Sequence, residues 1–510
     1  MNSIFIFIKD NIKYSIFLFF GVIFFLRSLL VDGWNDSDID AFIYLGSRLL
    51  NGELIFIDEF ETKLPFLQYI FSLAYMAGGI GSWRIITFLT IILNGFIAIK
   101  LLIDHFIKFE NLSTFCLQRY ILLFFGFFLS LIYALPGSES AQISMMSASF
   151  LFLSLSILIT SRKYRMICLS SVLFTFSGLI RQNYFYLLPI FCAWFFIDSS
   201  QINNLKKNLY LLLLYIFTSI TVCLLTFAPY FFIDNGLDKL FISIYAIKEF
   251  AGNAMSILEL LTRQLLNKRT IFFFSIFYIL LISILINFFY GAFKFDKKNK
   301  LFFFICVLTL VLNYSFITRY SHHYSILFVP FFSLIFIYSF LFYFKNIKKI
   351  LVILMIPVFF YPGYWVLKNA IQVLNGNIGF NFNINDRKIN KSILNYLTEI
   401  KNNGKTFLVI DNSIYHYILN EKRIGDGHPA ILSYVFRKIK INDLPHINLL
   451  DHKRNSDICD VLNRSNKDVL ILIDRNHYAF KGLFEACSDS INKVYKFKKF
   501  ENGKDSIIWE

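Results

Sequence analysis

The residues best suited to chemistry form an acidic stretch that follows the first strongly apolar segment of the chain. Residues 34–40, Trp-Asn-Asp-Ser-Asp-Ile-Asp, place carboxylates at alternate positions, Asp36, Asp38 and Asp40. Neighbouring carboxylates raise one another's pKa, so one can act as a general base near neutral pH, and the group can also bind a divalent cation. The simpler interpretation is that Asp36 or Asp38 caps a helix over about residues 38–50 and the other acids are solvated.

A second group combines an arginine with two adjacent histidines. Residues 318–324, Thr-Arg-Tyr-Ser-His-His-Tyr, precede an apolar segment that contains Pro330. Arg319 offers a fork of donors for an anionic group, and His322 or His323 can donate a hydrogen bond to the same group. The chain has 8 His in all, so composition alone does not explain an adjacent pair. Anchoring at the membrane interface by Tyr and His is the alternative.

Two further charged positions interrupt apolar segments. Glu139, in Ser-Glu-Ser, can orient a substrate or bind a metal, and it can equally cap the helix that follows. Arg181, in Arg-Gln-Asn, separates two apolar segments. An arginine at such a depth is costly without an anionic partner, which can be a phosphate or the carboxylate of a structural salt bridge.

The elements that must position these residues are membrane-spanning helices. The 510 residues are 56% hydrophobic and 16% charged, with a mean hydropathy of +0.58. This balance excludes soluble, disordered, collagen-like and disulfide-scaffold proteins. Apolar segments lie at 14–31, 66–82, 85–107, 119–135, 141–160, 166–180, 183–198, 209–232, 271–293, 301–317, 323–344 and 350–368. In a membrane protein, the net charge of +16 is first interpreted as a signal of orientation in the membrane and not as a sign of nucleic-acid binding.

The charge pattern predicts the topology. Short basic clusters occur at 162–165, 206–207, 294–300 and 345–349. Lys and Arg collect in cytoplasmic loops, and all four clusters are cytoplasmic only if residues 66–82 do not cross the membrane. We expect this glycine-containing stretch to be a helix in the membrane interface. The prediction is a polytopic α-helical membrane protein with about 11 spans, a cytoplasmic N-terminus and an external loop over residues 32–83.

The last part of the chain has a different character. After about residue 376, charged residues and Asn are frequent and the apolar runs become short and β-rich. We expect strands at Thr406–Ile410, Val469–Ile473 and Ile507–Trp509 and a helix at Asn390–Asn402. The predicted organisation is a membrane domain over 1–375 and an extracytoplasmic α/β domain over 376–510.

Three pairs or runs in this tail were considered as sites. Tyr415-His416 and residues 425–429 are expected to be core and turns, since no nucleophile or metal ligand set accompanies them. Cys459 and Cys487 are the two cysteines of this domain, and they can pair if the compartment is oxidising.

The first external loop resembles that of the GT-C membrane glycosyltransferases, the superfamily of protein mannosyltransferases and aminoarabinose transferases. Bacterial members typically carry two acids, a Tyr, a helix ending in Leu-Leu-x-Gly, Tyr-x-Asp, and Glu-x-Lys-Pro-Pro-Leu-x-Tyr. The matching positions are Asp38, Tyr44, Gly52, Asp58, Glu61, Lys63, Pro65 and Tyr69. The sequence departs at Ile39, where the family has its second acid, and at Leu64, where it has the first Pro. Glu139 and residues 318–324 resemble, more loosely, later motifs of the family.

The resemblance implies a GT-C fold and an inverting transfer of a sugar from a polyprenyl-phosphate carrier. The acceptor is a glycan or a lipid-linked molecule at the external face of a bacterial inner membrane, in O-antigen or other surface-polysaccharide modification. Asp38 is then the general base, with Asp36 or Asp40 supporting it. The implied contacts to substrate or lipid phosphate are Lys63, Glu61, Tyr44, Glu139, Arg181, Arg319, His322, His323 and Tyr324. Lys63 can alternatively extend to lipid headgroups.

The partners expected are the sugar carrier, the acceptor and the lipid bilayer, without nucleic acid; no cofactor beyond a divalent cation is implied. Two other function classes fit the sequence. An O-antigen polymerase also has many spans and charged external loops, but it joins whole repeat units. A transporter or flippase needs charged residues inside its spans, where this sequence has few.

Overall fold

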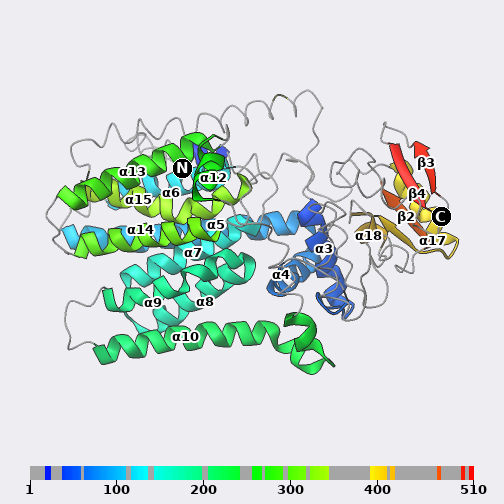
Figure 1. The fold of residues 1–510 in the computed structure, drawn as a ribbon, viewed down its shortest axis with the longest axis horizontal. Coiled ribbons are helices and arrows are strands. Elements are labelled where there is room, and N and C mark those ends of the chain that lie inside the picture. The colour runs from blue at the N-terminus through cyan, green and yellow to red at the C-terminus, as the bar shows by residue number, and fades with distance from the viewer. Residues whose placement is uncertain are drawn as a thin grey trace, which may run out of the picture. The chain divides into compact units, whose positions relative to one another are not determined.

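The computed structural model describes most of the membrane helices and the main elements of the tail (Figure 1). The described residues are 18–23, 37–58, 63–110, 117–135, 143–197, 205–241, 256–266, 270–290, 297–316, 322–343, 371, 391–409, 414–419, 468–472, 495–499 and 505–509. Within them, four helices are long and apolar enough to cross a membrane: Ile80–Ile107, Ile143–Thr160, Leu205–Phe232 and Tyr324–Leu341. The chain is therefore a helical membrane protein, as its composition predicts.

The chain divides into two compact units. The first contains residues 1–34, 84–225 and 253–381, and the second contains 35–83, 226–252 and 382–510. The second unit thus joins the first predicted external loop, the residues after the 205–225 segment, and the tail. The predicted domain division at residue 375 stays a prediction.

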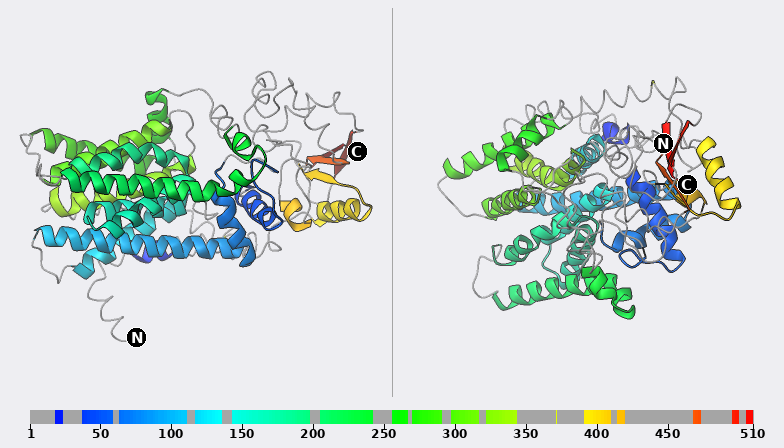
Figure 2. Two further views of the ribbon diagram at one scale, coloured as in Figure 1. Left: turned by 90° about the horizontal axis from the view of Figure 1, so that it is seen from below. Right: turned by 45° about the vertical axis from the view of Figure 1, so that its right-hand side comes forward.

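The first unit is made of helices that run side by side in two views (Figures 1 and 2). Its elements are α5 (Ile80–Glu110, whose first residues belong to the second unit), α6 (Leu117–Ala134), α7 (Ile143–Thr160), α8 (Tyr164–Ile180), η3 (Gln182–Leu187), α9 (Leu188–Ile197), α10 (Leu205–Phe227), α12 (Ile257–Leu265), α13 (Ile271–Tyr290), α14 (Lys297–Ser315), η6 (His322–Phe328), α15 (Val329–Tyr338) and η7 (Ser339–Tyr343). A further 3₁₀ segment, η5 (Ala228–Phe232), follows α10 in the second unit.

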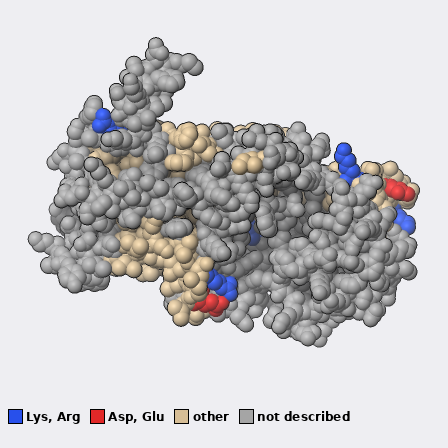
Figure 3. All heavy atoms as spheres, turned by 90° about the horizontal axis from the view of Figure 1, so that it is seen from above, with Lys and Arg blue, Asp and Glu red and all other residues tan. Residues whose placement is uncertain are grey.

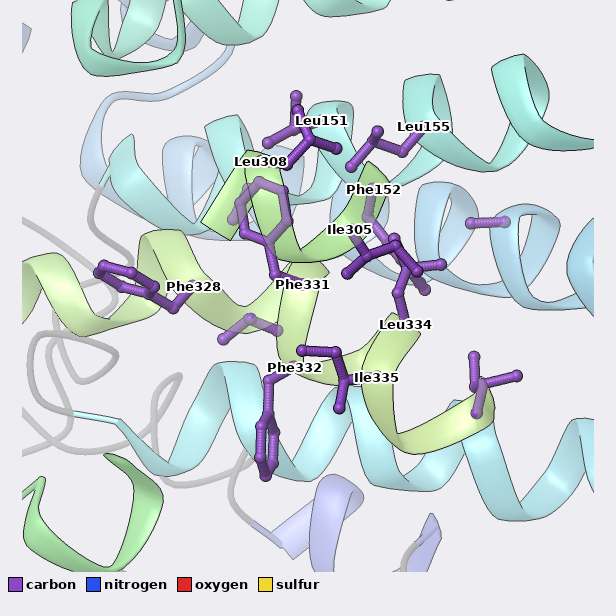
Figure 4. Close-up of a cluster of buried hydrophobic side chains, with 14 of the residues drawn as sticks. Leu151, Phe152, Leu155, Ile305, Leu308, Phe328, Phe331, Phe332, Leu334 and Ile335 are labelled. Atoms are coloured by element: carbon purple, nitrogen blue, oxygen red, sulfur yellow. The ribbon is translucent and has the colours of Figure 1, made fainter. Parts of the chain in front are cut away.

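The core of this unit is centred on α15, which is buried along its whole length. Figure 4 shows Phe331, Phe332 and Leu334 of α15 among side chains of α7 and α14. Helices α7 and α8 approach closely because small serines line their contact and exchange hydrogen bonds with the facing backbone. The Ser154 hydroxyl donates to Ser170 O at 2.7 Å, and the Ser170 hydroxyl donates to Ser154 O at 2.9 Å. Small residues that allow such approach are typical of helix contacts in membranes.

The outer surface of α10 is apolar, as expected for a helix that faces lipid. Leu213 and Phe217 are 57% and 70% exposed. Figure 3 shows one face of the molecule, on which described Lys, Arg, Asp and Glu residues appear in a few small groups. In a membrane protein, lipid covers such exposed apolar side chains, which a soluble protein would bury in its core.

The predicted spans correspond to helices wherever the structure describes them, apart from residues 66–82. Two of them, 183–198 and 323–344, begin with the 3₁₀ segments η3 and η6. Of the segment at 14–31 only residues 18–23 are described, as helix, and the segment at 350–368 lies outside the described residues. The total of about 11 spans stays a prediction.

Residues 66–82 form a short helix and a turn. Helix α4 (Phe66–Met76) has 11 residues and ends before Gly78 and Gly79, which have positive φ angles of 120° and 80°. At 1.5 Å per residue α4 is about 16 Å long, roughly half the hydrocarbon thickness of a bilayer. It is therefore too short to cross a membrane by itself.

The second unit contains α3 (Ser37–Leu50), α4 and the elements of the tail. The tail elements are α17 (Lys391–Asn402), β1 (Phe407–Val409), α18 (Ile414–Leu419), β2 (Val469–Leu472), β3 (Tyr495–Lys499) and β4 (Asp505–Trp509). The strands form one sheet in the order β1-β2-β4-β3, in which β1 and β2 are parallel and the other pairs are antiparallel. Leu397 of α17 packs with Phe407 and Ile471 in its core.

The predicted helix at 390–402 and the three predicted strands are confirmed, but β3 was not predicted. Its sequence, Tyr-Lys-Phe-Lys-Lys, reads as polar because three of its five residues are lysines. The sheet order explains this composition, since β3 lies at an edge. Lysines on an edge strand oppose pairing with another chain.

Candidate active site

The described part of the acidic stretch, from Ser37 on, forms the first turn of α3. The helix begins at Ser37, which confirms the helix predicted over 38–50. Asp36 lies outside the described residues, whereas the backbones of Asp38 and Asp40 belong to α3. Residues two apart in an α-helix are about 200° apart around its axis and do not share a face. Asp38 and Asp40 therefore lie on different faces of the helix.

Helix α3 is fixed against α4 at a glycine. A Cβ atom on Gly46 would lie 2.5 Å from Phe71 C and 2.7 Å from Ser72 N, so the two helix backbones approach without a side chain between them. Aromatic rings extend this contact. The ring of Phe71 lies 5.2 Å from that of Phe42 and is stacked on Trp83 at 4.1 Å. The first turn of α3 thus belongs to a rigidly packed helix pair.

Gln68 of α4 holds the loop that connects the two helices. Its side-chain amide donates to Leu45 O at 3.1 Å and to Glu53 O at 3.0 Å, and its carbonyl oxygen accepts from the Ile55 N–H at 3.1 Å. Gln68 is 3% exposed. These bonds supply partners to backbone groups of α3 and of the connecting loop.

Two acids of the predicted external loop have structural roles. The Arg48 guanidinium forms a two-bond salt bridge with Glu53, one bond of which measures 2.7 Å between Nε and Oε2. The Asp58 carboxylate accepts the Leu54 N–H at 2.9 Å and closes the turn over residues 54–58. The acidity of this loop is therefore partly used in local folding.

Two tyrosines attach this helix pair to the end of the 205–232 segment. The Tyr69 hydroxyl donates to Thr226 O at 2.9 Å, and the Tyr230 hydroxyl donates to Ile55 O at 2.8 Å. Burial raises the pKa of Tyr69 to about 12, so its phenol keeps the proton that it donates. The first residues of the same segment include Lys206 and Lys207. The acidic helix is thus attached to the end of this segment that is remote from its lysines.

The structure describes two of the other predicted residues of the first loop, Lys63 and Tyr44. Lys63 is half-buried and precedes Pro65, which forms the N-cap of α4. Glu61 lies outside the described residues. Tyr44, expected to contact substrate, is 1% exposed, and its ring meets that of His416 edge-on at 6.1 Å. The predicted core position of Tyr415 and His416 is confirmed, as they are 3% and 0% exposed, while residues 425–429, Cys459 and Cys487 lie outside the described residues.

A second region, in the first unit, brings together Arg181 and Tyr324. Helix α8 ends at Ile180, and Arg181 has an extended backbone before η3 begins. Its guanidinium carbon lies 5.3 Å from the centre of the Tyr324 ring, a cation–π distance. Both residues are buried, and Phe316 stacks on Tyr324 at 5.5 Å. The structure thus joins two of the predicted phosphate-binding residues.

Hydrogen bonds between helix ends hold this region. The Asn183 side-chain amide donates to Ser315 O at 3.1 Å, and the Tyr184 hydroxyl donates to Leu327 O at 2.8 Å. Nearby on α14, Asn313 accepts a bond of 3.0 Å from the amide of Gln264 in α12. The 3₁₀ segment η3 is therefore bonded directly to the end of α14 and to η6.

The remaining predicted residues of this region are only partly described. The backbones of His322 and His323 belong to η6, and the structure does not describe their side chains. Arg319 and Glu139 lie outside the described residues. Basic residues occur at the opposite ends of the helices that meet here: Arg162 to Arg165 at the start of α8, and Lys297, Lys298 and Lys300 at the start of α14.

Sequence reasoning missed Gly46, Gln68 and Asn183 as residues that build these regions. Gly46 offered a hint, as a glycine within a predicted helix implies a close approach. Gln68 and Asn183 offered no such hint in the sequence, because the role of each side-chain amide depends on which distant carbonyl groups it reaches. Among the described residues, no three His, Cys, Asp or Glu side chains gather as a metal-binding group. Comparison of the chain with protein-family models and with curated proteins found no match.

Proposed function

We propose that this protein is a membrane glycosyltransferase of the GT-C type. It transfers a sugar, with inversion, from a polyprenyl-phosphate carrier to a glycan or lipid-linked acceptor, in O-antigen or other surface-polysaccharide modification. About 11 spans, a cytoplasmic N-terminus and an extracytoplasmic α/β domain over 376–510 belong to the same proposal, as does a location in a bacterial inner membrane.

The observation that carries the proposal is the attachment of the acidic helix pair at one end of the 205–232 segment. Lys206 and Lys207 lie at its other end, and lysines at the end of a span favour the cytoplasmic side. The hydrogen bonds of Tyr69 and Tyr230 then favour an external position for α3. This is the face at which a polyprenyl-phosphate-linked sugar is used in the family that the first loop resembles.

The second region supports the same orientation. Arg181 ends α8, whose other end carries the basic run 162–165. A guanidinium buried at an external helix end is suited to an anionic group, because it supplies fixed positive charge in a medium of low dielectric constant. Developing negative charge on a leaving lipid phosphate is stabilised by such a group.

The proposed roles follow from these positions. Asp38 is the general base, and Asp40 is the weaker candidate because it lies on the other side of α3. Lys63, Arg181 and Arg319 bind phosphate, and His322 or His323 donates to phosphate or sugar. Tyr44, Glu61, Glu139 and Tyr324 complete the proposed set, and Asp36 is a further candidate for supporting the base. A divalent cation remains part of the hypothesis for the acids.

The test compares surface glycans from cells with and without the gene by mass spectrometry. We expect one sugar to be missing while long chains persist, and we expect membranes with the intact protein to transfer that sugar from a polyprenyl-phosphate donor. Loss of long chains with every sugar still present would instead favour a polymerase. Substrate flux in proteoliposomes without any transfer would favour a transporter.

A further inference from the structure

The tail packs against the acidic helix at His416. His416 of α18 is fully buried, and its ring lies edge-on to Tyr44 at 6.1 Å and tilted against Phe407 at 5.3 Å. Its Nε2 atom accepts the N–H of Val409 at 3.0 Å. One imidazole therefore contacts β1, α18 and α3.

The histidine has the bonding state needed for this arrangement. A ring nitrogen that accepts a backbone N–H is unprotonated, so His416 is held as the neutral imidazole with its proton on Nδ1. The hydrogen bond from Val409 of β1 thus sets the orientation of the His416 ring. In this orientation the ring meets Tyr44 edge-on. A phenyl ring of similar shape would keep the contact with Tyr44 and lose the bond to Val409.

This contact and the contact with α4 lie on opposite sides of α3. Tyr44 meets α18, whereas Gly46, two residues later and about 200° around the axis, meets the backbone of α4. Asp40 is one turn before Tyr44 and lies on the α18 side. Asp38 is about 120° from Tyr44, on the flank between the two contacts.

We propose that His416 and Tyr44 are positioning residues through which the tail sets the orientation of α3 and hence of its acidic first turn. Tyr44, one of the residues expected to contact substrate, then acts through its packing. The tail is in this way a part of the acidic site. The catalytic part of this inference rests on the proposed function, whereas the mechanical part does not.

Hydrogen exchange measured on the full chain in nanodiscs tests the mechanical part. We expect His416→Ala to raise the exchange of the amides over residues 41–48 by about tenfold, and His416→Phe to raise it less. Leu397→Ala is the control for lost core volume in the tail, because Leu397 lies in the core of the tail and is not part of the ring contact between His416 and Tyr44. Equal protection of 41–48 in the His416→Ala variant and the intact protein would overturn the proposal.

Sugar transfer tests the catalytic part. We expect His416→Ala to lower kcat about tenfold with little change in KM for the carrier, and His416→Phe to recover most of the loss. Leu397→Ala is expected to keep kcat near that of the intact protein. Faster exchange with an unchanged kcat would overturn the positioning role. If the intact protein transfers no sugar, the proposed function fails while the exchange result still decides the mechanical part.

Discussion

The two regions that hold the candidate site residues are built by different interactions. In the α3–α4 region, a side-chain amide, two tyrosine hydroxyls and a salt bridge bind mainly to backbone carbonyls and to each other. In the Arg181–Tyr324 region, the Tyr324 ring packs against a guanidinium and against Phe316, and Asn183 and Tyr184 donate hydrogen bonds to the carbonyls of Ser315 and Leu327. The first region contains a loop whose backbone N–H and C=O groups need side-chain hydrogen-bond partners. The second is a junction of helices, whose backbone groups bond to each other within each helix.

This difference predicts where each region is sensitive. The α3–α4 region depends on hydrogen bonds to buried backbone groups. Single substitutions that remove such a bond are therefore expected to lower the free energy of unfolding substantially. The Arg181–Tyr324 region depends on ring contacts that neighbouring side chains can partly replace. The predictions below test this contrast, beginning with the largest expected effect.

Replacing the proposed base has the largest expected effect. Asp38→Asn removes the proton acceptor and should lower sugar transfer by about 10²- to 10⁴-fold, the usual contribution of general-base catalysis. Asp40→Asn is the matched control, since Asp40 lies on the other side of α3, and it should retain most of the activity. Transfer assays in membranes that contain equal amounts of each variant measure both. Full activity of Asp38→Asn would remove Asp38 from the mechanism.

Removing the amide of Gln68 tests the hydrogen-bonded region. Gln68→Met keeps the side-chain length but leaves the carbonyls of Leu45 and Glu53 and the N–H of Ile55 without this partner. Each buried group left unpaired costs about 1–3 kcal/mol, so we expect a clear fall in thermal midpoint and faster amide exchange at Ile55. Asn183→Leu, the corresponding change in the other region, should cost less. A larger loss for Asn183→Leu would reverse the contrast.

Two glycines compare a backbone obstacle with a side-chain obstacle. A Cβ on Gly46 meets the backbone of Phe71 at 2.5 Å, whereas a Cβ on Gly178 meets the ring of Phe185 at 2.7 Å. We expect Gly46→Ala to destabilise by about 1–3 kcal/mol, because α3 and α4 must separate. Gly178→Ala should cost about 1 kcal/mol or less, since the ring can rotate and alanine favours the helix. Thermal unfolding in detergent measures both, and equal losses would contradict this distinction.

The smallest expected effect concerns the ring beneath Arg181. Tyr324→Leu removes a cation–π contact of about 0.5–2 kcal/mol, and a loss of this size raises KM for the carrier by a few-fold up to about thirtyfold. Tyr324→Phe keeps the ring and should behave as the intact protein. Kinetics with carrier as the varied substrate measure the difference. If Tyr324→Phe and Tyr324→Leu were equally impaired, the hydroxyl and not the ring would be the important group.

Most of the fold was predictable because its elements depend on local patterns. Long apolar runs predict the membrane helices, Pro65 and the glycines at 78, 79 and 81 indicate a stretch that does not cross the membrane, and short β-rich runs predict three strands of the tail. The strand β3 was missed because its lysines reflect its place at the edge of a sheet, which is a tertiary property. The 3₁₀ starts at η3 and η6 were likewise not visible in hydropathy.

The candidate site was predictable in residue type and only partly in arrangement. The sequence by itself determined that the chain is a helical membrane protein, that an acidic turn begins a helix near residue 38, and that Arg181 interrupts two apolar segments. Only the tertiary structure decided that Gln68 reaches the loop between α3 and α4, that Glu53 and Asp58 stabilise a turn, and that Tyr44 contacts His416. Spacing along the chain determines position around a helix only once the helix is known, and contacts between residues hundreds of positions apart depend on packing, which no local pattern records.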